Sequence, residues 1–269
     1  MDRLSMSELT TFRWSFEQDV QKFSAAGLSA MGVWRQKLSD FGDDRGVELL
    51  RDTGLQVSSL HWIGGFTGSD GRSHKESVED AREALELAVE LQCKTLVMYT
   101  GSRAGHTHNH ARRLAKGAIV ALAPQAEELG VDLALEPMHA ACASDCTFLT
   151  TLGEAVELID DIGSPAVKLV LDLYHMGFEE KLLEQIAALA DRISLVQIGD
   201  GRQTPTSEQN RCPLGEGMLP LGDMIAALRQ GGYAGYFEVE LLGEEFEPMT
   251  YDQILEQSMA TARELLGAS

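Results

Sequence analysis

The sequence predicts an α/β fold, a closed (β/α)8 barrel (TIM barrel) that forms a single domain over residues 1–269. Short apolar runs alternate with amphipathic helical stretches along the whole chain, and about eight such units can be traced. Strands that are joined by helices run parallel, and eight of them close naturally into a barrel. The length of 269 residues and a hydrophobic content of 44% suit one large core.

The expected strands are the apolar runs that follow turn-forming or helix-ending residues. Gly27, Gly54 and Gly130 each stand directly before such a run, where a helix that ends into a strand favours a left-handed residue. An open doubly wound sheet is the alternative, but the Gly-x-Gly-x-x-Gly fingerprint expected after its first strand is absent. The strands are expected at 8–13, 28–34, 55–61, 95–100, 131–136, 167–172, 193–198 and 235–241.

The expected helices lie between these runs. In 77–91, apolar residues recur at three- and four-residue steps, which is typical of a helix with one buried face. Capping-box patterns at 15–18, 151–154 and 250–253 predict that a helix begins at each of these points.

The charge and the cysteine content exclude several classes of protein. The chain has 42 acidic and 22 basic residues, a formal net charge of −20, which disfavours nucleic acid and anionic membrane surfaces as partners. No apolar run approaches the roughly 18 residues that a membrane span needs. The four cysteines show no CxxC spacing and are too sparse for a disulfide scaffold. We therefore expect a reduced, cytoplasmic protein.

Four of the expected strands end in a polar residue: Glu136, Asp172, Gln197 and Glu240. A carboxylate at the end of a buried strand must be paired, metal-bound or shifted in pKa, because an uncompensated buried charge costs several kcal/mol. The carboxyl ends of barrel strands face one mouth, where the active sites of such barrels lie. The four side chains are therefore expected to converge on one site.

Three carboxylates and an amide oxygen form a hard, all-oxygen ligand set. Such a set suits one divalent metal ion, Mn²⁺ or Mg²⁺ in the first place and Co²⁺ or Zn²⁺ as alternatives. Salt bridges to barrel lysines are the competing interpretation for any single acid. Glu238 has the same strand parity as Glu240 and also faces inward, but one layer deeper, where a paired core acid is expected.

Several short motifs in the second half of the chain resemble those of the xylose isomerase-like sugar isomerase/epimerase superfamily. This superfamily includes ketose 3-epimerases, hydroxypyruvate isomerase, inosose isomerases and dehydratases, and more distantly endonuclease IV. The resemblance covers nearly the whole chain. Its most specific motifs are Leu135-Glu136-Pro137, Asp172-x-x-His175, Val196-Gln197-Ile198-Gly199-Asp200, Pro213-Leu214-Gly215-Glu216-Gly217 and Val239-Glu240-Leu241.

The resemblance implies that Glu136, Asp172, Gln197 and Glu240 hold the metal ion, and that Glu136 and Glu240 also move the proton. It implies a substrate-binding role for His175. Two positions depart from the usual pattern. Most members of the superfamily carry His where Gln197 stands, although Gln occurs in members that resemble hydroxypyruvate isomerase. Cys142 stands where ketose 3-epimerases have a substrate-binding Glu.

The expected function is a metal-dependent isomerase or epimerase that acts on a small keto-sugar or related hydroxy-ketone through a metal-stabilised enediolate. A dehydratase acting on an inosose- or dehydroshikimate-like substrate is the alternative, because the same enediolate can expel a β-hydroxyl. An endonuclease IV-like phosphodiesterase is less favoured, since Tyr99 stands where a ligand His would be expected. A non-catalytic sugar-binding barrel is also less favoured. The expected partner is a small carbohydrate, and a homo-oligomer is compatible with the fold.

Further substrate contacts are expected from residues at or just beyond strand ends. His61 ends the third expected strand, His139 follows Glu136 closely, and Arg202 lies just beyond Asp200. The loop with His106, His108 and His110 is unusual. Because it precedes a helix, a substrate contact from one of the three is favoured over a second metal site, and its role stays open.

Overall fold

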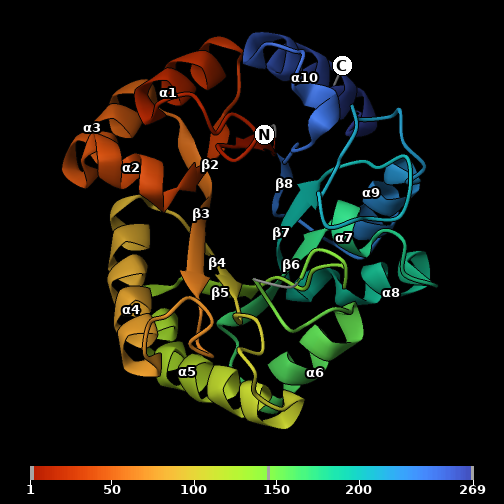
Figure 1. The fold of residues 1–269 in the computed structure, drawn as a ribbon. Helices are drawn as coiled ribbons and strands as arrows, with labels where there is room; N and C mark the ends of the chain where they lie inside the picture. The colour runs from red at the N-terminus through yellow and green to blue at the C-terminus, as the bar shows by residue number, and fades with distance from the viewer. Residues whose placement is uncertain (1–2, 144–145, 268–269) are drawn as a thin grey trace.

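The structure, a computed structural model, describes residues 3–143 and 146–267. Over these residues, eight parallel strands pair in chain order and close into a barrel, with β1 beside β8, which confirms the predicted fold (Figure 1). The strands are β1 (Leu4–Ser7), β2 (Ala30–Trp34), β3 (Gln56–Gly64), β4 (Thr95–Tyr99), β5 (Asp132–Leu135), β6 (Val167–Asp172), β7 (Ile193–Ile198) and β8 (Tyr236–Val239).

The expected first strand, 8–13, is wrong. The strand is the short segment Leu4–Ser7, and residues 8–13 form successive turns. In these turns the N–H of Thr10 donates to the carbonyl of Ser7 and the N–H of Thr11 donates to that of Glu8. Local backbone bonds thus use groups that a longer strand would offer to its neighbours. The other seven expected strands overlap the observed ones.

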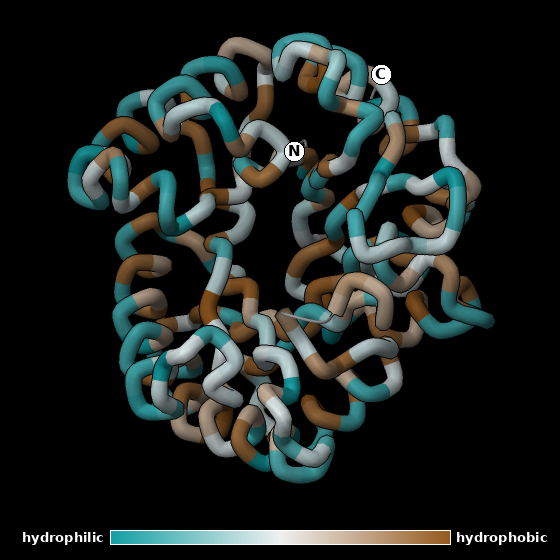
Figure 2. The backbone as a smooth tube through the Cα atoms, in the orientation of Figure 1, coloured by the Kyte–Doolittle hydropathy of each residue, from teal (hydrophilic) through white to brown (hydrophobic). Residues whose placement is uncertain are grey.

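Helices surround the barrel on its outside (Figure 1), and none in the described part of the chain is both long and apolar enough to cross a lipid bilayer. Hydrophilic and hydrophobic residues alternate along them (Figure 2), as expected of helices with one face on the barrel. Their bounds are α1 (Phe16–Ala25), α2 (Arg35–Phe41), α3 (Asp43–Thr53), α4 (His74–Glu90), α5 (His108–Leu129), α6 (Leu152–Ile162), α7 (Leu173–Met176), α8 (Leu182–Leu189), α9 (Leu221–Gln230) and α10 (Tyr251–Leu265).

The capping patterns fold largely as predicted. Complete capping boxes begin α1 at Ser15 and α10 at Thr250. At α6 the side chain of Thr151 accepts from the N–H of Glu154, but the Glu154 carboxylate accepts from the N–H of Thr150 instead. That helix is therefore capped without the reciprocal bond.

A buried charged cluster fixes the connection between β1 and α1. The Lys37 ammonium group donates to Asp19 at 2.5 Å and to the carbonyls of Glu8 and Thr11. Glu8 accepts from the N–H of Trp34, and all three charged side chains are buried. Burial raises the pKa of the Glu8 carboxyl well above its ordinary value, and the charge of Asp19 raises it further. Burial and the neighbouring Asp19 thus favour the neutral form of Glu8, and Asp19 and Lys37 form the ion pair.

We expect Asp19→Asn to lower the free energy of unfolding by about 3–5 kcal/mol, because it leaves the buried Lys37 ammonium group without its carboxylate. Glu8→Gln, which mimics the neutral acid, is the matched control and should cost far less. Urea unfolding measures both. Equal losses in the two variants would show that Glu8 is ionised.

The raised pKa of Glu8 also predicts how the stability of the Glu8→Gln variant, relative to the parent, depends on pH. A raised folded-state pKa means that the native state keeps a proton that the unfolded state releases, so stability falls as the pH rises from the ordinary Glu pKa towards the raised one. Glu8→Gln removes this loss. The free energy of unfolding of the variant, relative to the parent, should therefore increase between pH 5 and pH 8. A constant difference across this range would contradict it.

Candidate active site

The four predicted metal ligands all lie at the carboxyl ends of neighbouring strands. Glu136 directly follows β5, Asp172 ends β6, Gln197 lies near the end of β7 and Glu240 directly follows β8. The N–H groups of Glu136 and Glu240 continue the ladder by donating to the carbonyls of Met98 and Ile198. All four side chains are buried, with Glu240 the most exposed at 5%.

Arg211, which the sequence analysis did not single out, links two of these carboxylates. Its Nη2 donates to Asp172 Oδ2 at 2.8 Å and to Glu240 Oε1 at 3.3 Å. Gln197 Nε2 donates to the other oxygen of Glu240 at 2.8 Å. The Arg211 side chain is only 1% exposed, and its guanidinium lies 4.5 Å from the centre of the Tyr174 ring. Arg211 thus joins Asp172 and Glu240 directly, and Gln197 is joined to them through Glu240.

The carboxyl groups differ in pKa because their partners differ. Burial raises the pKa of Glu136 well above its ordinary value, and the charges of Glu240 and Asp172 add to this shift. Burial also raises the pKa of Glu240, although Arg211 opposes it. For Asp172, burial is outweighed by the charges of Arg211 and His175 and by hydrogen bonds, so its pKa is lowered. Three buried acids with one arginine leave negative charge uncompensated.

The unpaired atoms of the site fit a divalent cation. Among the described residues, Glu136 Oε2 and Gln197 Oε1 are buried oxygens without a hydrogen-bond partner. Ligand atoms of Glu136, Asp172 and His175 all lie within 4.8 Å of one another. Oxygen donors of this kind, next to excess negative charge, are what a hard divalent ion requires.

His175 follows Asp172 on the first turn of α7, so both point to the same centre. Asp172 Oδ1 accepts from the N–H of Tyr174 at 2.7 Å and from the N–H of His175 at 3.3 Å. Burial lowers the pKa of His175 to about 4, so its imidazole is neutral at pH 7. Within the described chain both ring nitrogens lack a hydrogen-bond partner. A neutral ring can donate from one nitrogen and accept at the other, which suits a hydroxyl or a metal ion.

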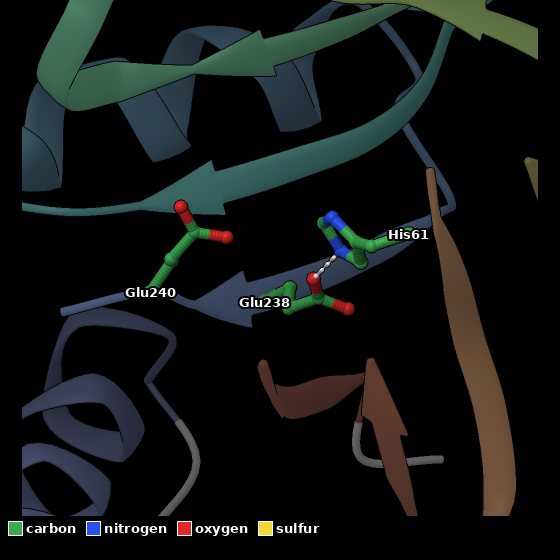
Figure 3. A group of neighbouring side chains, drawn as sticks. All are labelled: His61, Glu238 and Glu240. Carbon is green, nitrogen blue, oxygen red and sulfur yellow. Dashed lines mark hydrogen bonds and ion pairs between the residues drawn. The ribbon is translucent and has the colours of Figure 1, made fainter. Parts of the chain in front are cut away.

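Glu238 lies deeper in the barrel and is fully paired, as expected of a core acid. Its Oε2 accepts from the hydroxyls of Ser58 at 2.6 Å and Ser59 at 2.7 Å, and its Oε1 lies 3.0 Å from His61 Nε2 (Figure 3). A Cβ atom on Gly32 would lie 2.5 Å from this carboxylate, so only glycine leaves it room. Burial opposes the protonation of His61, but its bond to Glu238 outweighs this and raises its pKa.

Arg202 lies in a surface cluster and not among the buried acids. Its guanidinium is about half exposed and donates to the carboxylates of Glu216 and Glu245. Two surface carboxylates thus compensate the charge of Arg202, and its substrate-binding role stays a prediction. Arg211 reaches the centre from the same loop. Its only sequence signal is its place two residues before the Pro213–Gly217 motif.

The β7–α9 loop, residues 199–220, covers the buried acids. It contributes Arg211, and the carbonyl of Thr206 accepts from the Cys142 thiol at 3.0 Å. The N–H of Arg211 donates to the carbonyl of Leu242, just beyond Glu240. Asp200 stabilises the loop by accepting from the N–H groups of Gly201, Gly215 and Gly217.

The other residues that the sequence analysis named lie at the end of β4 or in the segments that follow β4 and β5. His139 is partly buried, and its Nδ1 accepts from the N–H of Ala141. Tyr99 ends β4, and its buried hydroxyl interacts with Glu136. His108 packs edge-on against Phe148, away from the paired rings of His106 and His110.

Comparisons with known proteins identify the family. The family described as xylose isomerase-like TIM barrel matches residues 20–265. An inosose isomerase of Halalkalibacterium halodurans is 26% identical over 88% of this chain and 83% of its own. A D-psicose 3-epimerase of Enterocloster bolteae is 35% identical over 42% of this chain, a match that spans only 35% of that protein.

Solved structures show the same fold. The protein SMc04130 of Sinorhizobium meliloti superimposes with a TM-score of 0.89 at 26% identity, covering 98% of both chains. The IOLI protein, solved with a binding zinc atom, superimposes with a TM-score of 0.85 at 21% identity, also covering 98% of both.

We expect Arg211→Leu to lower the free energy of unfolding of the metal-free protein by about 3–5 kcal/mol, because it leaves buried carboxylates without their cation. Added Mn²⁺ should recover part of this loss. Arg202→Leu, from the same loop but with an exposed side chain, should cost far less, because surface ion pairs are screened by solvent. Urea unfolding with and without the ion tests this, and equal effects of the two substitutions would contradict it.

Proposed function

Because this chain belongs to the xylose isomerase-like TIM barrel family, we propose that it is a divalent-metal-dependent isomerase or epimerase of a small keto-sugar or related hydroxy-ketone. Relatives described as inosose isomerase, ketose 3-epimerase and hydroxypyruvate isomerase support the reaction class. The observation that carries the proposal is the buried centre of Glu136, Asp172, Gln197 and Glu240, which has unpaired oxygens and excess negative charge.

The ion would be held by Glu136, Asp172, Gln197 and Glu240. A ring nitrogen of His175 lies within 4.8 Å of carboxylate oxygens of Glu136 and Asp172. When bound, such an ion polarises a carbonyl and so acidifies the neighbouring C–H group. Manganese or magnesium suits these oxygens better than a softer ion does.

The two glutamates divide the proton transfer between them. Glu240 accepts hydrogen bonds from Arg211 and Gln197, which favour its ionised form and suit it to remove a proton. We assign the return of the proton to Glu136, the other glutamate of the centre, whose Oε2 has no hydrogen-bond partner among the described residues. In an isomerisation the proton would leave one carbon of the substrate and arrive at the next. In an epimerisation it would leave one face of a carbon and return to the opposite face.

The remaining polar groups would bind and orient the substrate. Nε and Nη1 of Arg211 are buried without a partner among the described residues, and both donate, so they suit substrate oxygens. The neutral His175 ring suits a hydroxyl. His61 Nδ1, also unpaired, and His139 are further proposed contacts. The covering loop would exclude water from the reacting carbon.

A dehydratase is the second candidate. The proton taken from carbon could be delivered to a departing β-hydroxyl instead of to a second carbon, and the presence of two buried glutamates at the centre favours it, because one can remove the proton while the other donates.

Glu240→Gln and Glu136→Gln should each lower the exchange of a substrate C–H with solvent deuterium by about 10²–10⁴-fold, because each removes a group that carries the proton. Exchange is followed by NMR with the manganese-loaded protein on a panel of ketoses and inososes. Glu245→Gln, at the surface, is the control. Exchange at the parent rate in both variants would refute the assignment of the two glutamates. A product of the parent protein that has lost one water molecule, detected by mass spectrometry, would identify the dehydratase.

Removal of the metal should abolish exchange and also destabilise the fold, since an ion that binds only the native state stabilises it by about 2.7 kcal/mol at 100 times its dissociation constant. We expect Mn²⁺ to raise the melting temperature of the chelated parent and to raise that of Asp172→Asn much less. A rise of the same size in both would place the ion elsewhere.

A further inference from the structure

The loop that follows β4 brings two of its three histidines together. His106 lies just before α5 and His110 lies in the first turn of that helix. Their ring centroids are 4.7 Å apart and the ring planes are inclined by 34°. Both side chains are partly exposed, so an ion from solvent can reach them. Neither residue belongs to the buried acid centre.

The spacing matches two imidazoles that share one metal ion. A metal–nitrogen bond is about 2.0–2.1 Å, and the ring centre lies roughly 1.1 Å beyond the nitrogen, so each centre is about 3.1–3.2 Å from the ion. Two rings at about 90–110° around the ion then have centres roughly 4.4–5.2 Å apart. The observed 4.7 Å lies within this range.

We propose that His106 and His110 form a second metal site, selective for a borderline divalent ion such as Cu²⁺, Ni²⁺ or Zn²⁺, with water completing the coordination. Imidazole nitrogen prefers these ions, whereas the oxygen-rich centre of Glu136, Asp172, Gln197 and Glu240 prefers manganese or magnesium. The two sites therefore select different metals, and this inference does not depend on the proposed reaction.

His108, between the two, takes no part. Its ring packs edge-on against Phe148 at 5.6 Å between centroids, and its Nε2 lies 3.8 Å from the carboxylate of Glu154. It has the same chemistry and lies in the same loop, so it provides a matched control.

Arg113 competes for the site. Its Nη2 donates to His110 Nδ1 at 2.7 Å, so this nitrogen accepts a hydrogen bond and the ring proton lies on Nε2. We assign Nδ1 of His110 as the ligand atom, because it carries the lone pair in this tautomer, and a metal ion bound there displaces the exposed Arg113 side chain. The competition makes the site weaker than two histidines alone would form.

The test is electron paramagnetic resonance of the full-length protein with one equivalent of Cu²⁺, after the acid centre has been filled with Mg²⁺. We expect superhyperfine coupling from two imidazole nitrogens that falls to one nitrogen or disappears in His106→Asn and in His110→Asn and is unchanged in His108→Asn. It should also be unchanged in His175→Asn and in His61→Asn, which each remove an imidazole close to the acid centre. Two-nitrogen coupling that survives in either of the first two variants, or that is lost in any of the others, would overturn the site.

Arg113→Gln gives an independent measurement. Removal of the competing donor should raise Cu²⁺ affinity several-fold in titration against a chelator. Arg112→Gln removes the same charge one residue away, from a side chain that pairs with Asp161, and should raise it less. No rise in Arg113→Gln, or an equal rise in both, would show that Nδ1 is not the ligand atom.

Discussion

The contact of Arg211 with Asp172 and Glu240 is the interaction on which the mouth of this barrel depends. Three carboxylates and an amide converge there, and without a cation their mutual repulsion and burial would oppose folding. Arg211 supplies one positive charge from the β7–α9 loop and places it between two of the strands. Glu136 has no basic hydrogen-bond partner among the described residues, and burial, together with the charges of Glu240 and Asp172, raises its pKa well above the ordinary value.

Two other buried carboxyl groups are compensated in different ways, and this separates structural acids from reactive ones. Glu238 is saturated by two serine hydroxyls and His61, in a space that Gly32 leaves open. Glu8 lies beside the ion pair of Asp19 and Lys37, and burial raises its pKa, which favours its neutral form, although its Oε1 has no hydrogen-bond partner among the described residues. The strand-end centre differs because three buried carboxyl groups share one arginine there.

Much of the fold and of the centre could be predicted from the sequence, because buried parallel strands are apolar runs and a polar residue at their end stands out. Glu136, Asp172, Gln197 and Glu240 were found this way. The first strand could not be placed, since Leu4–Ser7 alternates apolar residues with serines and is followed by threonines that favour strands but here form turns. Arg211 was missed for a different reason. It lies in a long loop, where no periodicity indicates which of two arginines turns inward, and only the three-dimensional structure separates it from Arg202.

The covering loop has a thermodynamic consequence. Arg211 belongs to this loop, and the carboxylates with which it pairs are almost fully buried. A conformation in which the loop held Arg211 away from Asp172 and Glu240 would leave the centre more negative, and it would attract an external ion more strongly than the conformation described above. Ion uptake and loop opening are therefore linked equilibria, and each shifts the other by the same free energy.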